Sequence, residues 1–271
     1  MIMPEAKLQQ KILSIIGDAE RRRTPADLQE LIFGDKREGK KLLRNAIREL
    51  IDRQKLMYVS ELGHTFLIAA LNKPVRLSDR VVLKPEECSF DEGPGDIVIN
   101  FQHGVSFGGG QHPTTRLCLR GLEELIRLRP DLMKLDNTSA LDIGTGSGIL
   151  IIAAVKIGLN MGLGVDVDPI SIAEAKKNVH MNNLDNRIRI LSQPFESIDN
   201  SFDLIMANLR WPTLDSYLPK MIQNLKNGGN LLLSGIQSQE RDDLVELGEQ
   251  NALKLVWKKE EKGWAAVSFS R

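Results

Sequence analysis

The stretch Leu141–Ile149 has the residue types and spacing of a loop that binds a nucleotide-like cofactor. An apolar run reaches Asp142, and Gly144, Gly146 and Gly148 then alternate with other residues before a second apolar segment begins. Glycine in such a loop permits a tight turn, lets the backbone approach a ligand, and allows close packing of strand and helix. Loops that bind a dinucleotide pyrophosphate are spaced Gly-x-Gly-x-x-Gly, unlike the strict alternation here. The alternative is an ordinary glycine-rich turn.

Two side chains downstream follow apolar runs and extend the candidate site. Asp166 lies 22 positions after Gly144, and a carboxylate about 20 residues beyond such a loop can reach ribose hydroxyls. Asn208 ends the run Phe202–Asn208, which predicts a strand. Ligands in open α/β sheets bind at the carboxyl ends of the strands. We therefore predict Asp166 as the ribose ligand and Asn208 at the same edge.

Helical and strand patterns alternate from Thr114 to the end of the chain. Helices are expected at 114–128, 149–157, 170–181, 214–225 and 239–250, and strands at 139–143, 162–167, 187–191, 202–208, 230–234, 253–258 and 264–268. This alternation predicts an α/β fold with a doubly wound, mainly parallel sheet of seven strands. The last two strands form a hairpin, which we expect to place one antiparallel strand at the sheet edge. Asp168 and Pro169 are expected to cap the helix that follows them.

The first 71 residues differ in character and predict a separate small domain. Apolar residues recur at helical spacing from Leu8 to Ile16, Thr24 and Pro25 mark a second helix start, and a longer helix is expected at about 37–54. Two short strands around a turn follow. Three helices and a hairpin are typical of a winged helix. The predicted domains are 1–71, winged-helix-like; 72–103, a linker and hairpin; and 104–271, the main domain.

Composition limits the classes of partner and compartment. Among 271 residues, Lys plus Arg and Asp plus Glu both number 36, so no overall charge selects nucleic acid or an anionic membrane. No apolar stretch approaches the ~18 residues of a membrane helix, and the start lacks a signal-peptide core. Cys88 and Cys118 have no metal or redox spacing. We expect reduced thiols, no metal, no membrane partner and a cytoplasmic location.

The strict Gly144-x-Gly146-x-Gly148 spacing resembles the first motif of class I S-adenosylmethionine-dependent methyltransferases. A second stretch, Gly104–Leu119, contains Phe-Gly-Gly-Gly-Gln-His-Pro-Thr-Thr and resembles the Phe-Gly-x-Gly-x-His-x-Thr-Thr loop of the PrmA-like ribosomal-protein methyltransferases. The likeness continues through Asp166 and Asn208 and covers about 74–271. It implies S-adenosylmethionine as cofactor and amino groups of a protein, lysine or N-terminal amine, as acceptors. A ribosomal protein is one candidate partner.

The resemblance also implies roles for individual residues. Cofactor contacts correspond to Thr115, Gly144, Asp166 and Asn208, and Phe107 with its glycines would form a lid over the sulfonium. Asp142 would contact the amino end of the cofactor, and Asn208 would orient the acceptor amine. The full set of predicted cofactor residues is Phe107, Thr115, Asp142, Gly144, Gly146, Asp166 and Asn208.

Three further residues have proposed roles, and two of these residues have two interpretations each. His112 is either a general base or a structural residue, and Phe195 either covers adenine or lies in the core. Trp211 is interpreted as an apolar wall beside the acceptor. Thr114 and Thr115 stand at the start of the helix expected at 114–128. One hydroxyl is expected to cap the helix and the other to bind the cofactor.

Two departures from the family leave the acceptor open. The family's Asn-Ile-Leu-Ala segment is here Asn208-Leu209-Arg210-Trp211, and the winged-helix-like start replaces the family's small α/β module. An RNA or small-molecule acceptor is therefore an alternative. The segment Lys36–Lys55 holds eight cations against three acids. Nucleic-acid binding through residues 1–71, or a DNA-binding regulator that senses S-adenosylmethionine, is the other alternative, with a solvated helix face explaining the same run.

Overall fold

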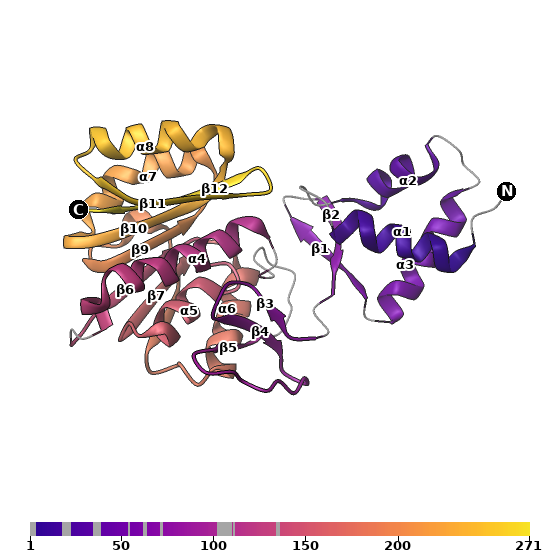
Figure 1. Cartoon of the computed structure of the whole chain (residues 1–271), viewed down its shortest axis with the longest axis horizontal. Helices are drawn as coiled ribbons and strands as arrows, with labels where there is room; N and C mark the ends of the chain where they lie inside the picture. Colours follow the sequence, from indigo (N-terminus) through magenta and orange to yellow (C-terminus); the bar gives the residue numbers. More distant parts are fainter. Residues whose placement is uncertain are drawn as a thin grey trace.

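The computed structural model describes residues 4–17, 23–34, 39–53, 55–61, 64–70, 73–101, 110, 112–133 and 136–271. Its centre is a seven-stranded sheet in the order β11-β12-β10-β9-β6-β7-β8 (Figure 1). The strands are β6 (Ser139–Ile143), β7 (Met161–Asp166), β8 (Ile188–Ser192), β9 (Phe202–Asn208), β10 (Leu225–Gln237), β11 (Lys254–Glu261) and β12 (Trp264–Ser270). The predicted doubly wound sheet of seven strands is confirmed.

The position predicted for the antiparallel strand was wrong. β12 runs antiparallel to both β10 and β11, and it lies between them rather than at the edge. Its sequence explains this placement, because β12 is buried at five consecutive positions and needs covering on both faces. β11 carries Lys258, Lys259 and Glu260 with exposed side chains, which suits an edge strand.

Helices cover both faces of this sheet, and each face has its own apolar cluster. Leu119 of α4, Ile152 of α5 and Ala175 of α6 belong to one cluster, whereas Leu214 of α7 and Leu244 of α8 belong to the other. Figure 1 shows α7 and α8 on the opposite side of the strands from α4. The helices are α4 (Pro113–Leu128), α5 (Ile149–Ile157), α6 (Pro169–Met181), α7 (Trp211–Gln223) and α8 (Arg241–Gln250), with single 3-10 turns at Pro130–Met133, Phe195–Ser197 and Ser238–Glu240.

Strand register places the candidate residues at one level of the sheet. Ile143 of β6 pairs with Val165 of β7 and with Ala207 of β9. The next residue on each chain segment is Gly144, Asp166 or Asn208. Because the three strands are parallel, these residues share the carboxyl edge of the sheet, where ligands bind in such folds.

The segment expected to be a linker with a hairpin forms a three-stranded sheet instead. Its strands are β3 (Val75–Arg76), β4 (Val81–Pro85) and β5 (Ile97–Phe101). β4 and β5 are parallel and so do not form the predicted hairpin. A short hairpin joins β3 to β4. Leu83 and Ile99 are fully buried in the cluster that contains α4 and α5, so this sheet packs on the main fold.

The N-terminal part contains α1 (Glu5–Gly17), α2 (Pro25–Phe33), α3 (Gly39–Asp52), β1 (Leu56–Glu61) and β2 (His64–Ala69). These elements have an apolar cluster of their own, which includes Leu8, Leu28 and Leu67. Thr24 caps α2 through a reciprocal capping box with Asp27, and Pro25 occupies the first turn as predicted. Arg23 forms a β-bridge with Leu67. A third extended segment therefore adjoins the antiparallel pair β1–β2.

The described part of the chain was considered for membrane-spanning helices, metal ligands and disulfide bonds. None of its helices combines the length and apolar character needed to cross a membrane. Its His, Cys, Asp and Glu side chains form no group of three that would hold a metal ion. Cys88 is half-buried and Cys118 is buried, and neither forms a disulfide bond.

Candidate active site

The glycine loop between β6 and α5 needs glycine for its conformation and for close contacts. Gly144 has φ +67°, in the left-handed region that side chains disfavour, and Gly148 has φ +79°. The N–H groups of Gly144 and Thr145 donate to Val165 O at 2.9 and 3.0 Å, which fixes the loop against β7. A Cβ on Gly144 would lie 2.7 Å from Leu209 Cδ2. The loop is therefore held between the ends of β7 and β9.

Asp142 is a buried carboxyl group with one oxygen left over. Thr145 Oγ1 donates to its Oδ2 at 2.7 Å. Oδ1 is buried, and no described residue gives it a hydrogen bond. Burial raises the pKa of Asp142 to about 7 and the charge of Asp166 adds to the rise, against the opposing effect of the Thr145 hydroxyl. A buried acceptor of this kind is costly unless a donor reaches it.

Asp166 ends β7 with its carboxylate oriented by backbone donors. Gly146 N donates to Oδ2 at 2.9 Å, while Val167 N and Asp168 N donate to Oδ1 at 2.8 and 3.0 Å. The carboxylate is thus tied to the glycine loop. The predicted cap is confirmed, because Asp168 accepts from Ile170 N and Ser171 N at the start of α6.

Two exposed apolar side chains shortly after Asp166 were not predicted. Val167 is 70% exposed and Ile170 is 55% exposed, although both are large hydrophobic residues. Their place at the carboxyl edge of the sheet gives a ligand an apolar surface next to the carboxylate. The sequence signal was available, since the apolar residues Val167 and Ile170 flank the helix-capping pair Asp168-Pro169 between strand and helix.

Asn208 stands at the end of β9 with an unpartnered acceptor. Its Oδ1 is buried and receives no hydrogen bond from the residues that the structure describes. The next residue is fixed, because Leu209 N donates to Ser234 O at 3.0 Å. Gly235, with φ +91°, lies at an irregularity of β10, and a Cβ there would be 2.3 Å from Leu209 O. The missing side chain of Gly235 therefore lets the chain after Asn208 pass.

Replacing Gly235 with alanine should destabilise the protein by about 3 kcal/mol, from backbone strain together with overpacking. Gly263→Ala is the matched control, because Gly263 also has a positive φ of +78° but has no atom within 4 Å of the added Cβ. We expect this control to cost about 1 kcal/mol. Chemical denaturation measures both, and equal losses would show that close passage of Leu209 contributes nothing.

The start of α4 separates the two threonines in a way that differs from the expectation. His112, not a threonine, caps the helix: Thr114 N donates to its Nδ1 at 3.3 Å, and Thr114 Oγ1 lies 2.8 Å from the same nitrogen. The imidazole also meets the Trp264 ring edge-on at 5.0 Å. Thr115 Oγ1 is buried and has no partner in the described ranges. Thr115 is thus the threonine available to a ligand.

Cys118 connects this helix to the rest of the site. The thiol lies one turn after Thr115 on the same face of α4. Burial raises the pKa of this thiol, the charge of Asp142 adds to the rise, and the nearby Ser234 side chain opposes it. The first turns of α4 therefore lie beside the carboxyl edge of β6 and β10. Thr115, Asp142 and Asn208 come from three separate segments, and each has a buried oxygen with no described partner.

Other predicted residues fall elsewhere. Phe107 lies outside the described residues, so its assignment stays a prediction. Phe195 is 2% exposed and its ring packs 5.2 Å from that of Tyr217, which supports the core interpretation over the adenine face. Trp211 begins α7, earlier than expected, and is half-buried against the apolar cluster of that face. Arg210 occupies the N-cap position of α7 without a side-chain capping bond, and it is exposed.

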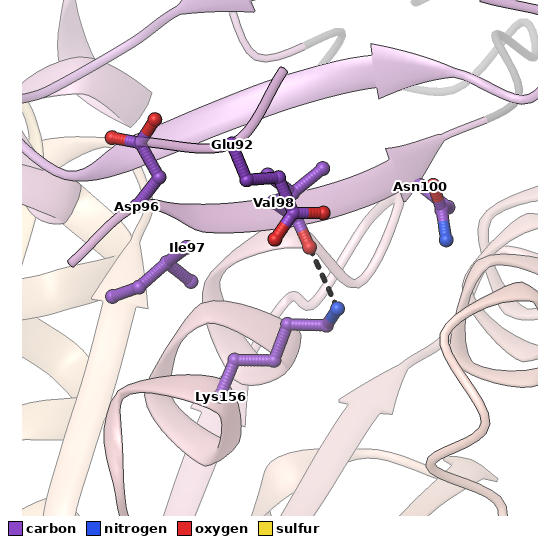
Figure 2. A pocket seen from close by; sticks show the side chains of 6 residues that line it. All are labelled: Glu92, Asp96, Ile97, Val98, Asn100 and Lys156. Atoms are coloured by element: carbon purple, nitrogen blue, oxygen red, sulfur yellow. Dashed lines mark hydrogen bonds between the residues drawn. The ribbon is translucent and has the colours of Figure 1, made fainter. Parts of the chain in front are cut away.

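A hollow of about 250 Å³ lies away from these residues. Figure 2 shows its lining, in which Lys156 Nζ donates to Val98 O at 2.6 Å. Lys156 is in the last turn of α5, whereas the glycine loop precedes the first turn. Since the hollow includes none of the predicted site residues, it is a separate feature.

Strand order, the antiparallel β12 and a glycine loop at the carboxyl edge together define the class of this protein. The fold is that of the class I S-adenosylmethionine-dependent methyltransferases. The chain belongs to the ribosomal protein L11 methyltransferase (PrmA) family, whose profile matches residues 65–271. The resemblance predicted from Gly104–Leu119 and the glycine loop is confirmed.

Relatives give the extent of this match. The ribosomal protein L11 methyltransferase of Pelobacter propionicus is 38% identical over 176 residues, covering 65% of this chain and 56% of the relative. The ribosomal protein L11 methyltransferase of Geotalea uraniireducens is 31% identical over 201 residues, which cover 73% of this chain and 64% of that relative. The crystal structure of a ribosomal protein L11 methylase from Lactobacillus delbrueckii subsp. bulgaricus is 26% identical with TM-score 0.65, covering 73% of this chain and 98% of that one. The chain thus spans 56–64% of the length of these two curated relatives.

Proposed function

We propose that this chain is a methyltransferase that uses S-adenosylmethionine to methylate amino groups of a protein. The observation that carries the proposal is the set of buried, unpartnered oxygens on Thr115, Asp142 and Asn208 at the carboxyl edge of the sheet. Such oxygens are costly in a folded protein unless a ligand supplies their partners. The named activity of the relatives makes a ribosomal protein one candidate acceptor.

The residues present fit the cofactor. Asp142 Oδ1 would accept from the α-ammonium group, and the hydroxyl of Thr115 would donate to the carboxylate. Asp166 would accept from the ribose hydroxyls, beside the exposed Val167 that adenine would cover. The backbone of Gly144 and Gly146 would line the same side without a Cβ to obstruct approach.

The acceptor requires positioning and deprotonation. S-adenosylmethionine supplies an electrophilic methyl group when bound. Asn208 Oδ1 would accept an N–H of the incoming amine and so aim its lone pair. An amine buried beside a cation loses its proton more easily, because burial and like charge both lower its pKa. His112 Nδ1 accepts from Thr114 N and so caps α4, which supports the structural interpretation of His112 over that of a general base.

Residues 1–71 are part of the proposal as a winged-helix-like domain that selects the acceptor, joined through 72–103 to the domain at 104–271. The separate apolar cluster of α1, α2, α3, β1 and β2 supports this division. A cytoplasmic location is also proposed, supported by free Cys88 and Cys118. RNA or a small molecule as acceptor is the alternative outcome.

Calorimetry with S-adenosylmethionine tests the cofactor proposal. We expect binding of one molecule per chain, and Asp166→Ala should weaken it about 10- to 100-fold, as expected for lost hydrogen bonds to a charged group. Asp199→Ala is the control, because its side chain is 91% exposed and pairs with Lys220 on the surface. No binding by the natural chain, or the same affinity after Asp166→Ala, would contradict the proposal.

The acceptor is tested with radiolabelled cofactor and a cell lysate separated into protein, RNA and small molecules. Label that appears in protein and survives as methylated amine after acid hydrolysis supports the proposal. Label confined to RNA or to small molecules would overturn the acceptor assignment and leave the cofactor assignment standing.

A further inference from the structure

Helix α3 presents a row of cations to solvent. Lys40, Lys41, Arg44 and Arg48 are exposed, while Leu43, Ala46, Ile47 and Leu50 are buried. At 3.6 residues per turn, the four cations fall within a sector of about 100°, whose centre is about 120° around the helix from the centre of the buried sector. They lie within nine consecutive residues, so the first and last are about 12 Å apart along the helix axis. We call these four residues the α3 cationic face.

The described residues leave the α3 cationic face without acidic partners. None of its four side chains forms an ion pair or side-chain hydrogen bond with a described residue. Glu49, an acid on the same helix, is used elsewhere: Arg53 Nη2 and Gln9 Nε2 donate to its Oε2 at 3.1 and 3.0 Å. Asp52 is a turn beyond Arg48 and is the remaining acid of α3. Unpaired cations gathered on one face create a local positive field in a chain with no net charge.

Its chemistry suits a phosphate backbone better than a protein. Asn45 and Asp52 are the exposed polar residues that border this sector. Ile51 lies in the same sector one turn after Arg48, but it is half-buried against the N-terminal apolar cluster, and no aromatic side chain of α3 lies among the cations. Leu42 is 40% exposed, but by helical period it points about 100° away from the nearest cation. Protein interfaces depend on buried aromatic and apolar anchors and are depleted in lysine, whereas phosphates need only cations and N–H donors.

The arrangement of α3 favours duplex DNA among nucleic acids. α3 follows α2 after a short connection and precedes the β1–β2 pair, so it occupies the position of the recognition helix in a helix-turn-helix unit. Such a helix fits the major groove of B-form DNA, about 12 Å wide, whereas the major groove of duplex RNA is too narrow for it. We propose that the α3 cationic face binds the backbone of duplex DNA. This inference does not depend on methyl transfer.

Salt dependence of binding tests the proposal with the full chain. Fluorescence anisotropy with a short mixed-sequence DNA duplex should give a slope of log K against log salt near −3.6, about −0.9 for each of four phosphates. Arg44→Ala/Arg48→Ala should halve the slope to about −1.8. A fourfold rise in salt would then weaken binding by about 150-fold in the natural chain and about 12-fold in the variant.

The control is Lys7→Ala/Lys11→Ala, which removes two exposed charges from α1 in the same part of the chain. Alanine favours helix at all four positions, and circular dichroism checks that both variants fold. The control should keep the natural slope. An unchanged slope in the α3 variant, an equal loss in the control, or tighter binding to an RNA duplex would each overturn the proposal. Failure here leaves cofactor binding by calorimetry untouched, so the two results are independent.

Discussion

Asn208→Ala should lower kcat for methyl transfer by about 100- to 1000-fold, the range found when one positioned polar group is removed from an active site. Cofactor affinity should change less than about threefold, because in the proposed arrangement the lost oxygen would face the acceptor rather than the body of the cofactor. The Oδ1 of Asn208 has no described partner, so its removal leaves no protein donor unpaired. Single-turnover kinetics with labelled cofactor measure the chemical step directly.

Asn208→Asp provides the conservative comparison. It keeps an oxygen acceptor at the same place and should retain more activity than alanine, with a changed pH profile because the group now titrates. Thermal unfolding should place both variants close to the natural chain. Equal losses of cofactor affinity and turnover in Asn208→Ala would identify Asn208 as an ordinary binding residue and contradict its assignment to the acceptor.

Local signals in the sequence were sufficient for the strands and the glycine loop. The bounds predicted for β6, α5 and β9 agree with the structure, because apolar runs there end at glycine, aspartate or asparagine. The separation of Asp166 from Gly144 also reflects local geometry, since one strand, one loop and one helix fix where the next strand ends. These features depend on short stretches of chain, and a single sequence displays them.

Features that depend on distant pairing were not predictable. β4 and β5 are joined across 11 residues and pair in parallel, which no local pattern reports. β12 lies between β10 and β11 because it is buried on both faces. That burial is known only once β10 and β11 have been placed. Gly235 is similar, because its need for glycine comes from Leu209 passing over it.

The different surroundings of Thr114 and Thr115 at the start of α4 could also be seen only in the folded structure. Two adjacent threonines cannot be distinguished from the sequence alone, and histidine is not among the residues that favour the N-cap position. Only the three-dimensional arrangement shows Thr114 beside His112 and Thr115 with a buried, unpartnered hydroxyl. In the same way, the raised pKa of Asp142 comes from burial by segments far away in the chain.

Affinity for S-adenosylmethionine should fall about tenfold for each pH unit below 7. Burial raises the pKa of Asp142 to about 7, so its carboxyl group is protonated below that pH in the free protein. Its proposed ligand, the α-ammonium group, binds the ionised form. Binding at lower pH must therefore release a proton, and at pH 5 the affinity should be about 100-fold below its limit.

In the free protein, the contribution of Asp142 to folding stability changes with pH in the opposite direction to the cofactor affinity. A raised pKa means that the folded state holds this proton more tightly than the unfolded chain, so the contribution of Asp142 is present at low pH and is lost as pH rises through 7. Bound cofactor compensates for the loss. The gain in melting temperature on adding cofactor should consequently grow between pH 5 and 7.

Calorimetry in buffers of different ionisation enthalpy gives both the affinity and the number of protons released, which should approach one near pH 6 and vanish above the pKa. The range ends near pH 7.5, because α-amino groups lose their own proton around 7.7–8.0. Asp142→Asn should bind weakly with no pH dependence over this range. Asp166→Asn should also bind weakly but keep the dependence, with a lower midpoint because the Asp166 charge helps to raise the pKa of Asp142. A pH dependence that survives in Asp142→Asn would assign the titration to another group and exclude Asp142 as the ligand of the ammonium.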